Sequence, residues 1–585
     1  MTVAALVLLW GVLAWGVLLT TRAWLTARTL DHERRSAPAA PGPAPASAPG
    51  PGPASASAPG SATASASAPG TGPALASASG PAPGPGPAPA PAPGAPAPAP
   101  PGTEPPHVVL LIPALREQDL LPEVVRAVAA LDHPAGRAHV VVVTTEREEE
   151  ARRRDLGRVG DLVACLTAAP DPRAAAAHLA GVVPSTRAPA LAERVRAAED
   201  PVRTLRTELT ALPTTRDVAV ALLPALAAEF PGVSLRHLHH VSTAGAKSGQ
   251  LVHAVERLPG ILPADADPAR TYIGVYDADS QPDRTTLTHL SRVVAAAQHR
   301  QGEGPALVQQ LPLQLRRPYA ARPGPADLLL RAHAAADLRR RMGVEAYRIH
   351  AQARLRRRRW LPDRLRTVLE PVVYGIGAGL FVRHDVLLSI GMYEEPVDDL
   401  LVGYKLSSAG ASTAVLPVFN LVDRYARVGA LGRAYSLVAL GSAAGCARLA
   451  RDPVLRAFGR RNTVVLVKEG LDTVWWFAGP PCVAGAAAWL LVAGAPGALA
   501  WWAGAAVAYL LAHARVSLRA ADRFVGHHEG ARARAEPSGP GGYVRLLPAF
   551  LAQPLLHWLG PLRLAAARTT AVLTQQPLTM GKTER

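Results

Sequence analysis

The chain has 585 residues, of which 49% are hydrophobic and 18% are charged, and its formal net charge is +17. This composition is too apolar for a disordered protein and too polar for a polytopic transporter, so it fits a soluble domain that carries a few membrane segments. Aromatic residues make up only 5% of the chain, which argues against base stacking and therefore against nucleic acid as a partner. Because the arginines lie mainly beside apolar runs, we expect membrane lipids with anionic headgroups to meet the positive charge.

An almost uninterrupted apolar stretch, Val3 to Thr20, opens the chain and is followed by arginines. A signal peptide would carry its positive charge before the apolar core, so residues 1–21 are predicted to be an uncleaved transmembrane anchor. The arginines after the anchor place that side in the cytoplasm. Residues 22–106 follow as a basic stretch and a linker rich in Pro, Ala, Gly and Ser. The linker has almost nothing large to bury and is predicted to be disordered.

Buried strands alternate with helices in the next part of the chain. Val108–Ile112, Val140–Val143 and Tyr272–Tyr276 are apolar runs of strand length, and apolar residues at helical spacing lie between the first two. This alternation predicts an α/β fold with a mainly parallel sheet and helices on both faces. The pattern fades near Asn420, so residues 107–425 are predicted to form one domain.

The C-terminal part of the chain is predicted to lie at or in the membrane. Residues 426–470 are expected to form membrane-interface helices, and 471–515 holds two apolar segments separated by a short turn, which predicts a transmembrane hairpin. Residues 516–585 are read as a basic loop, an apolar segment and a cytoplasmic tail. The apolar segment 546–562 contains Pro and His, so we favour an interfacial or re-entrant helix over a span. These segments together predict a multi-pass cell-membrane protein with its α/β domain in the cytoplasm.

The turn Asp277-Ala278-Asp279 directly follows the third apolar strand. In open α/β sheets, ligands bind at the carboxyl ends of the strands. Two carboxylates one residue apart can both reach one hard cation such as Mg²⁺ or Mn²⁺, which also takes phosphate oxygens. The alternatives are a solvated polar turn and a phosphatase with an aspartyl nucleophile. Gln281 stands where such phosphatases usually have Thr or Val, and the motif lies in the middle of the domain.

Several segments around this turn resemble a known family. The chain from about residue 107 to residue 420, a little over half of the sequence, is similar to the catalytic domain of family-2 glycosyltransferases. This is the inverting, metal-dependent group with the type A fold, which includes cellulose, chitin and hyaluronan synthases. The matching segments, in the family's order, are Leu111–Glu117, Gly245–Leu251, Tyr276–Asp283, Tyr374–Arg383 with Gly391–Glu395, and Asp398–Tyr404.

The resemblance implies a role for each matching residue. Asp277 and Asp279 would hold the metal ion, Mg²⁺ or Mn²⁺. Asp399 takes the place of the second carboxylate in the family's Glu-Asp pair and is assigned as the general base. The compact ammonium of Lys247 suits the diphosphate or the uracil of the donor. The predicted substrate-binding residues are Glu117, Glu146, Lys247, Asp277 and Asp398.

The sequence also departs from the family's pattern. Arg116 stands where the family has Asn, Thr144-Thr145-Glu146 replaces an Asp-rich turn, and Asp398 replaces Glu. The segment Gln-x-x-Arg-Trp of processive synthases has no counterpart in residues 424–440. Transfer of one or a few sugars is therefore as plausible as synthesis of a polymer.

The leading hypothesis is a membrane-bound glycosyltransferase that uses a nucleotide-sugar donor, expected to be UDP-linked, and a glycan or lipid-linked acceptor. The alternative is a non-catalytic membrane scaffold that retains the fold, which the departures above would favour. The arginine runs 339–341 and 356–359 are expected mainly to face lipid or solvent.

Overall fold

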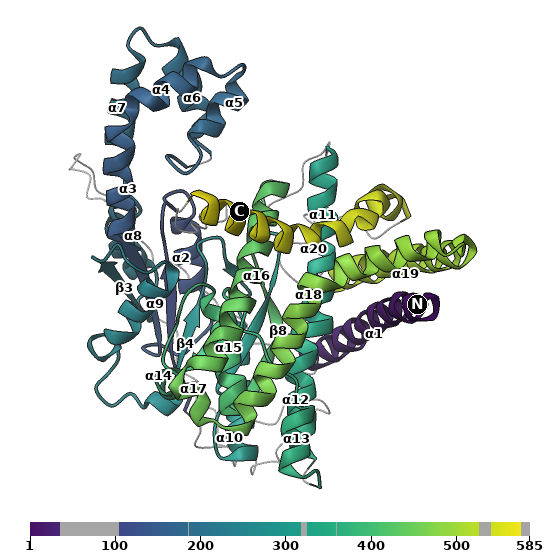
Figure 1. The fold of residues 1–585 in the computed structure, drawn as a ribbon. Helices are drawn as coiled ribbons and strands as arrows, with labels where there is room; N and C mark the ends of the chain where they lie inside the picture. The colour runs from purple at the N-terminus through teal and green to yellow at the C-terminus, as the bar shows by residue number, and fades with distance from the viewer. Residues whose placement is uncertain (36–103, 185, 317–323, 359, 526–539, 575–585) are drawn as a thin grey trace, which may run out of the picture.

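The computed structural model describes residues 1–35, 104–184, 186–316, 324–358, 360–525 and 540–574. Most of the predicted linker and the end of the predicted tail lie outside these residues. Figure 1 shows a central sheet with helices around it, a group of short helices above one end of the sheet, and long helices that extend to the opposite side.

Eight strands form one sheet in the order β3-β2-β1-β4-β7-β6-β8-β5. The first four in the chain are parallel: β1 (His107–Pro113), β2 (Ala138–Thr145), β3 (Val233–His240) and β4 (Thr271–Val275). β6 (Leu307–Leu313) and β8 (Thr413–Leu421) are also parallel, whereas β7 (Leu380–Arg383) is antiparallel to both neighbours and β5 (Gln281–Pro282) is antiparallel to β8. The three apolar runs of the sequence are β1, β2 and β4, and the predicted mainly parallel sheet is confirmed.

Helices cover both faces of the sheet, as predicted. Side chains of a strand point alternately to opposite faces, so Leu110 and Leu111 of β1, both fully buried, belong to different cores. The first core includes side chains of α2 (Leu121–Ala129), α8 (Thr215–Glu229) and α10 (Thr286–Gln301). The second includes side chains of α9 (Lys247–Glu256), α14 (His384–Ser389) and α15 (Asp398–Ala409). Burial on both faces explains why β1 and β2 are continuous apolar runs.

A helical insertion separates β2 from β3 and was not foreseen from the sequence. It comprises α3 (Glu146–Gly157), α4 (Val159–Ala168), α5 (Pro172–His178), α6 (Ala188–Ala197) and α7 (Pro201–Ala211). Asp171 and Asp200 cap α5 and α7 by accepting backbone hydrogen bonds, which satisfies otherwise unpaired N–H groups. Leu166, Leu191 and Leu205 lie in a separate apolar cluster, so the insertion has a small core of its own. Figure 1 shows these helices above the α/β domain.

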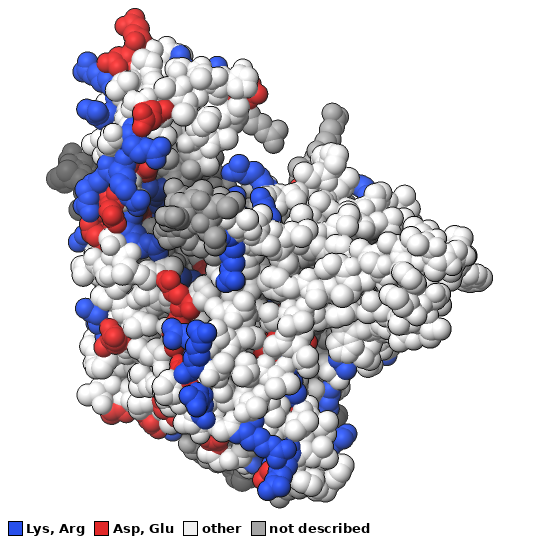
Figure 2. Space-filling view, viewed as in Figure 1, with Lys and Arg blue, Asp and Glu red and all other residues white. Residues whose placement is uncertain are grey.

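Four helical stretches of the described chain are long and apolar enough to cross a membrane: Thr2–Arg35, Pro201–Glu229, Arg460–Val492 and Pro496–Asp522. Pro201–Glu229 consists of two helices, α7 and α8, and α8 packs on the sheet, so we assign it to the α/β domain. The other three are α1 (Thr2–Arg35), α18 (Arg460–Val492) and α19 (Pro496–Val525), which contact one another. Figure 2 shows that the side of the molecule where they lie is almost free of charged residues.

The first of these helices is longer than the predicted anchor. α1 continues past residue 21 to Arg35, because Ala23, Ala27 and Leu30 pack into a cluster with β6, β8 and the π-helical segment η3 (Arg341–Ala346). Gly343 of η3 permits this close approach, since a Cβ there would lie 2.7 Å from the carbonyl oxygen of Leu19. The basic stretch after the anchor is therefore part of a helix that joins the apolar helices to the α/β domain.

The remaining helices connect the α/β domain to the apolar helices. α11 (Pro325–Arg340) leads into η3 and α12 (Tyr347–Arg357), which α13 (Asp363–Leu369) follows. α16 (Val428–Arg451) and α17 (Pro453–Ala457) lie in the predicted interface region. The apolar segment 546–562 belongs to a single long helix, α20 (Pro540–Thr574), which packs against α11 and α16. Two short 3-10 helices, η1 (Leu258–Gly260) and η2 (Pro268–Arg270), precede β4.

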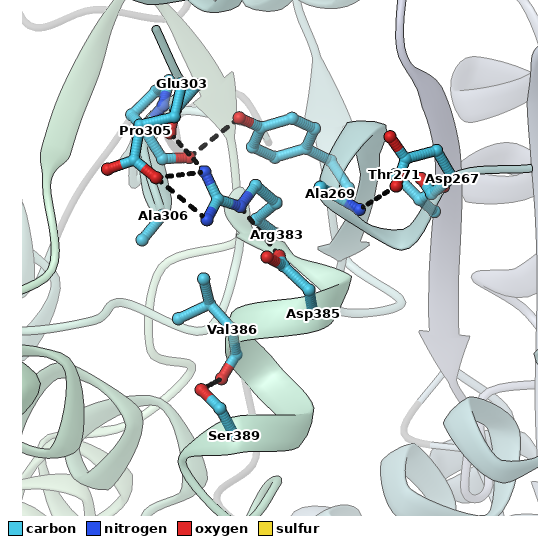
Figure 3. A network of polar contacts seen from close by, with 12 residues as sticks. Asp267, Ala269, Thr271, Glu303, Pro305, Ala306, Arg383, Asp385, Val386 and Ser389 are labelled. Atoms are coloured by element: carbon cyan, nitrogen blue, oxygen red, sulfur yellow. Dashed lines mark hydrogen bonds and ion pairs between the residues drawn. The ribbon is translucent and has the colours of Figure 1, made fainter. Parts of the chain in front are cut away.

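A polar network fixes the edge of the sheet where β4 begins (Figure 3). Arg383, at the end of β7, pairs with Asp385 at 2.7 Å and donates to the carbonyl oxygen of Gly304, also at 2.7 Å. The hydroxyl of Tyr272 in β4 donates to the carbonyl oxygen of Pro305 at 2.8 Å. Because β4 and β7 are antiparallel, this network lies at the edge opposite Asp277.

Candidate active site

Asp277 and Asp279 lie at the carboxyl end of β4, as predicted. β4 ends at Val275, and the chain then forms a turn in which the N–H of Ser280 donates to the carbonyl oxygen of Asp277 at 2.9 Å. The Asp279 carboxylate is 5% exposed and accepts a hydrogen bond from the N–H of Asp423 at 3.1 Å. Both aspartates line one large cavity. It lies at the carboxyl edge of the parallel strands, where β4 ends and its turn begins.

Lys247 lies at the beginning of α9 and meets the first of these aspartates. Its Nζ is 2.6 Å from Asp277 Oδ1. The preceding Gly245 has a φ of +73°, a left-handed conformation that glycine adopts without strain. Glu395 accepts hydrogen bonds from the N–H of Ala246 and from Ser248 Oγ, so it holds the loop that carries Lys247.

Asp398 and Asp399 form the first turn of α15. The two oxygens of Asp399 accept hydrogen bonds from the N–H groups of Gly377 and Leu400. A Cβ on Gly377 would lie 3.1 Å from Asp399 Oδ2 and 3.1 Å from Lys247 Nζ. The glycine therefore lies against both charged groups, and a larger residue there would have to displace one of them.

Burial and neighbouring charges shift the pKa values of this cluster. Burial alone would lower the pKa of Lys247, but the charges of Asp277, Asp398 and Asp399 outweigh it and hold that pKa above its usual value. Burial raises the pKa of Asp398 to about 6, against the opposing effect of Lys247. The pKa of Asp399 is also raised, first by burial, although Lys247 and the two N–H groups oppose the shift. A carboxylate with a raised pKa is a stronger base.

Most of the predicted site residues share the cavity, which has a volume of about 1880 Å³. Its described lining includes Glu117, Lys247, Asp277, Asp279, Asp398 and Asp399. Glu146 is not among the described residues that line it. That carboxylate pairs with Arg153 at 3.0 Å and with His239 at 3.3 Å, because α3 begins at Glu146 directly after β2. The predicted contact of Glu146 with substrate therefore has no support from its position.

Glu146 belongs instead to a different polar group. Ligand atoms of Glu146, Glu149 and His239 lie within 4.8 Å of one another, a spacing that could hold a metal ion. The Nδ1 atom of His239 lies 2.9 Å from Thr144 Oγ1, and Arg153 already neutralises Glu146. All three residues are partly exposed, and such groups are common without an ion, so we assign no site here.

The arginine runs lie only partly as expected. Arg340 and Arg341 line the cavity, and Arg341 Nε is 2.9 Å from Asp337 Oδ2. Arg356 pairs with the buried Glu370 at 3.1 Å. For Arg340, Arg341 and Arg356 the expectation of a lipid or solvent contact is therefore wrong, because each pairs with a carboxylate. Arg357 and Arg358 are exposed, as expected.

Two supporting residues were missed in the sequence. Gln309 of β6 is fully buried and bonds both ways with Ile376, accepting from its N–H at 3.0 Å and donating to its carbonyl oxygen at 3.1 Å. It thereby fixes the loop that presents Gly377 to Asp399. Glu395 lay inside a matching segment but received no role. A buried glutamine in a strand gives no signal of its own, since only the fold brings it beside that loop.

Comparisons with known proteins add distant structural likenesses. No family model matches the sequence, and no curated protein matches it. A mannosyltransferase from Pyrobaculum calidifontis, PcManGT, in complex with GDP-Man and Mn²⁺, is similar at 16% identity and a TM-score of 0.37, over 73% of this chain and 89% of that one. TarS 1–349 of S. aureus is similar at 10% identity and a TM-score of 0.30, over 82% of this chain and 98% of that one. Its complex with UDP-GlcNAc gives 11% identity and a TM-score of 0.24 over the same shares. Likenesses this remote assign no activity.

Proposed function

We propose that this protein is a membrane-bound glycosyltransferase that moves a hexosyl or N-acetylhexosaminyl group, with inversion, from a nucleotide-sugar to a glycan or lipid-linked acceptor. The observation that supports this most directly is the contact between Lys247 and Asp277, with Asp399 beside the same ammonium and within one cavity. A cation, a candidate metal ligand and a candidate base are thus adjacent, which the chemistry of sugar transfer requires.

Asp399 is positioned to act as the general base. Two N–H groups hold its carboxylate, and burial raises its pKa, so it accepts the proton of an acceptor hydroxyl more readily than a solvated aspartate. The acceptor oxygen forms its bond to the anomeric carbon as the bond from that carbon to the nucleotide breaks on the opposite face. That arrangement inverts the configuration, and the nucleotide diphosphate leaves.

Lys247 and the start of α9 are suited to the diphosphate of the donor. The N-terminus of a helix presents unpaired N–H groups and a partial positive charge to an anion. Lys247 is the first residue of α9 and adds a full charge at the same end. We expect the donor to be UDP-linked, as the family resemblance implies.

The donor set of this cluster fits a hard divalent cation. Asp277, Asp279, Asp398 and Asp399 bring four carboxylates to the lining of one cavity, and carboxylate oxygens are the ligands that such cations prefer. Asp277 and Asp279 would hold Mg²⁺ or Mn²⁺. When bound, such an ion neutralises the charge that develops on the departing diphosphate.

The membrane arrangement follows from the apolar helices. We propose that α1, α18 and α19 cross the membrane and that the α/β domain lies in the cytoplasm, where nucleotide-sugars are available. Their almost uncharged surface and the arginines that follow the apolar part of α1 support this orientation. α20 is not among the described helices with the hydropathy of a span, which is compatible with an interfacial position.

The test is sugar transfer by membranes that contain the full chain, with UDP-hexoses, UDP-N-acetylhexosamines and GDP-mannose as donors. We expect D279A and D399N to abolish transfer, whereas D363N, at an exposed aspartate of α13, should leave it unchanged. Unchanged turnover in both site variants would refute the assignment. Calorimetry with UDP and Mn²⁺, read together with the transfer assay, distinguishes an enzyme from the non-catalytic scaffold. The scaffold alternative predicts either no binding or binding without turnover.

A further inference from the structure

The cavity extends beyond Asp399 into a space between helices. Its wall there comes from α11 and η3, from α16, from α18 and from α20. We call this part the helical chamber and define it by Asp337, Arg340, Glu345, Tyr435, Trp476 and His557. None of these residues belongs to a segment that matched the family, so the chamber is an addition to the site described above.

Aromatic rings form one wall of the chamber. The rings of Trp476 and His557 are stacked, with centroids 5.1 Å apart and an angle of 19° between the planes. Tyr435 meets His557 edge-on at 5.4 Å. Three helices that are distant in sequence thus bring ring faces and polar edges to the same place. Flat amphipathic rings of this kind can pack against an apolar face of a ligand while their polar atoms meet its hydroxyl groups.

The charged groups of the chamber are already balanced. Arg340 Nη2 lies 3.5 Å from Glu345 Oε1, and its Nε lies 3.5 Å from Asp337 Oδ1. A phosphate would need cations that are not already paired in this way. Arg340 therefore does not form an anion site in the chamber, although arginine beside a membrane often does.

One hydrogen-bond acceptor atom in the wall of the chamber has no donor among the described residues. Glu345 is 3% exposed and lines the cavity, and its Oε2 atom has no hydrogen-bond partner among the described residues. A buried carboxylate oxygen without a partner is costly. A hydroxyl group of a bound ligand would satisfy it, whereas a phosphate oxygen would be repelled.

We propose that the helical chamber binds a neutral pyranose ring, the terminal sugar of the acceptor, and that the acceptor is not a lipid phosphate. Ring faces, paired charges and a buried carboxylate oxygen together suit a ligand that is uncharged, flat on one side and rich in hydroxyl groups. The inference rests on the proposed function, because the ring would present a hydroxyl group toward Asp399. It narrows the acceptor to a glycan or a glycolipid.

The test measures binding without turnover. Full-length D399N protein in nanodiscs would be titrated with methyl β-glucoside, methyl β-mannoside and methyl N-acetyl-β-glucosaminide, and separately with farnesyl phosphate, by saturation-transfer NMR. We expect at least one methyl glycoside to bind and W476A and E345Q each to weaken it about tenfold. W501A, at a residue of α19 that is 79% exposed, should have no effect. Octyl β-glucoside, whose tail reaches the bilayer, would bind more tightly than methyl β-glucoside if the natural acceptor is a glycolipid, and equally if it is a free glycan.

Several results would overturn the inference. These are no binding of any glycoside, binding that neither W476A nor E345Q weakens, or binding of farnesyl phosphate alone that these changes weaken. If the proposed function itself were wrong, the results would differ from these. Glycosides would then still bind in the chamber, while the wild-type protein would neither bind UDP with Mn²⁺ nor consume any nucleotide-sugar.

Discussion

The two halves of the cavity are built in different ways. The donor half, with Lys247, Asp277, Asp279 and Asp399, comes from turns and helix ends at one edge of the sheet. The helical chamber comes from the middle of long helices, where Tyr435, Trp476 and His557 meet. The first half is rich in charge and held by backbone hydrogen bonds, whereas the second is lined by rings and paired ions.

This difference has a physical reason. Parallel strands bring their carboxyl ends to one edge, where loops are free of the sheet's hydrogen bonds and can carry charged groups toward a ligand. Helices that pack side by side instead present flat rows of side chains, and ring faces fill the space between them. We therefore expect the donor half to determine whether transfer occurs and the chamber to determine which acceptor is used.

Beyond D279A and D399N, the largest effect on transfer should come from removing the cation of the donor half. K247M leaves Asp277, Asp398 and Asp399 without their ammonium, so we expect transfer to fall about 100-fold. Affinity for UDP with Mn²⁺ should also fall, while glycoside binding in the chamber stays unchanged. Enzyme kinetics and calorimetry check the two halves separately. A parallel loss of glycoside affinity would show that the halves are not independent.

A smaller effect is expected from a single methyl group between the two charged groups. G377A places a Cβ 3.1 Å from both Asp399 Oδ2 and Lys247 Nζ, so one of them must move. We expect kcat to fall about tenfold with little change in the acceptor KM. G429A is the matched control, because a Cβ on Gly429 in α16 meets nothing within 4 Å. Equal activity of the two variants would argue against a role for this close contact.

Low pH should destabilise the whole protein, and therefore both halves of the cavity, through buried histidines at the edge of the sheet opposite the site. Burial, with a smaller contribution from neighbouring positive charges such as that of His107, lowers the pKa values of His133 and His139 to about 4. Below pH 6.5 the unfolded chain binds protons that these buried imidazoles do not, so stability falls as the pH drops from 6.5 toward 4. The loss should reach at most about 3 kcal/mol for each residue.

The apparent Tm of the purified protein between pH 7.5 and pH 5 measures this loss. We expect H139Q to flatten the pH dependence and H299Q, at an exposed position of α10, to leave it unchanged. A Tm that H139Q makes more sensitive to acid would contradict the assignment of a neutral buried imidazole.

The smallest effect on activity is expected at the network shown in Figure 3. R383A removes the donor to Gly304 and the partner of Asp385, so we expect a loss of about 2 kcal/mol in stability. The KM values for donor and acceptor should stay within about twofold, because the network lies at the edge opposite the site. R284A, at an exposed ion pair with Asp132, is the control for removal of an arginine. A change in KM with R383A would show that this edge is coupled to the cavity.

Much of the α/β domain was predictable from the chain. The apolar runs Val108–Ile112 and Val140–Val143 are strands β1 and β2, because only strands buried on both faces need such continuous apolar sequence. That Lys247 and Asp277 lie close together was also predictable, since each follows a parallel strand that ends at the same edge of the sheet. Asp399 follows no such strand, because β7 ends at the opposite edge, and only the family resemblance placed it in the site. Their roles stay predictions that the variants above would test.

Other features depended on contacts that no local pattern reveals. The helical insertion between β2 and β3 was missed, although it has its own apolar cluster. Glu146 was placed at the donor by its position after a strand, but the helix that begins there directs it to Arg153 and His239. Residues 339–341 were expected mainly to face lipid or solvent, yet Arg340 pairs with Asp337 and Glu345.

By itself, then, the sequence determined the mainly parallel sheet, the apolar helices and the carboxylates at the end of β4, because hydrophobic periodicity and residue type act over a few neighbouring positions. Only the tertiary structure decided which side chains form the helical chamber beyond Asp399. Trp476 and His557 are stacked although they are 81 positions apart. Such a contact depends on how whole helices pack, and the packing of helices is set by side chains from every part of the chain at once.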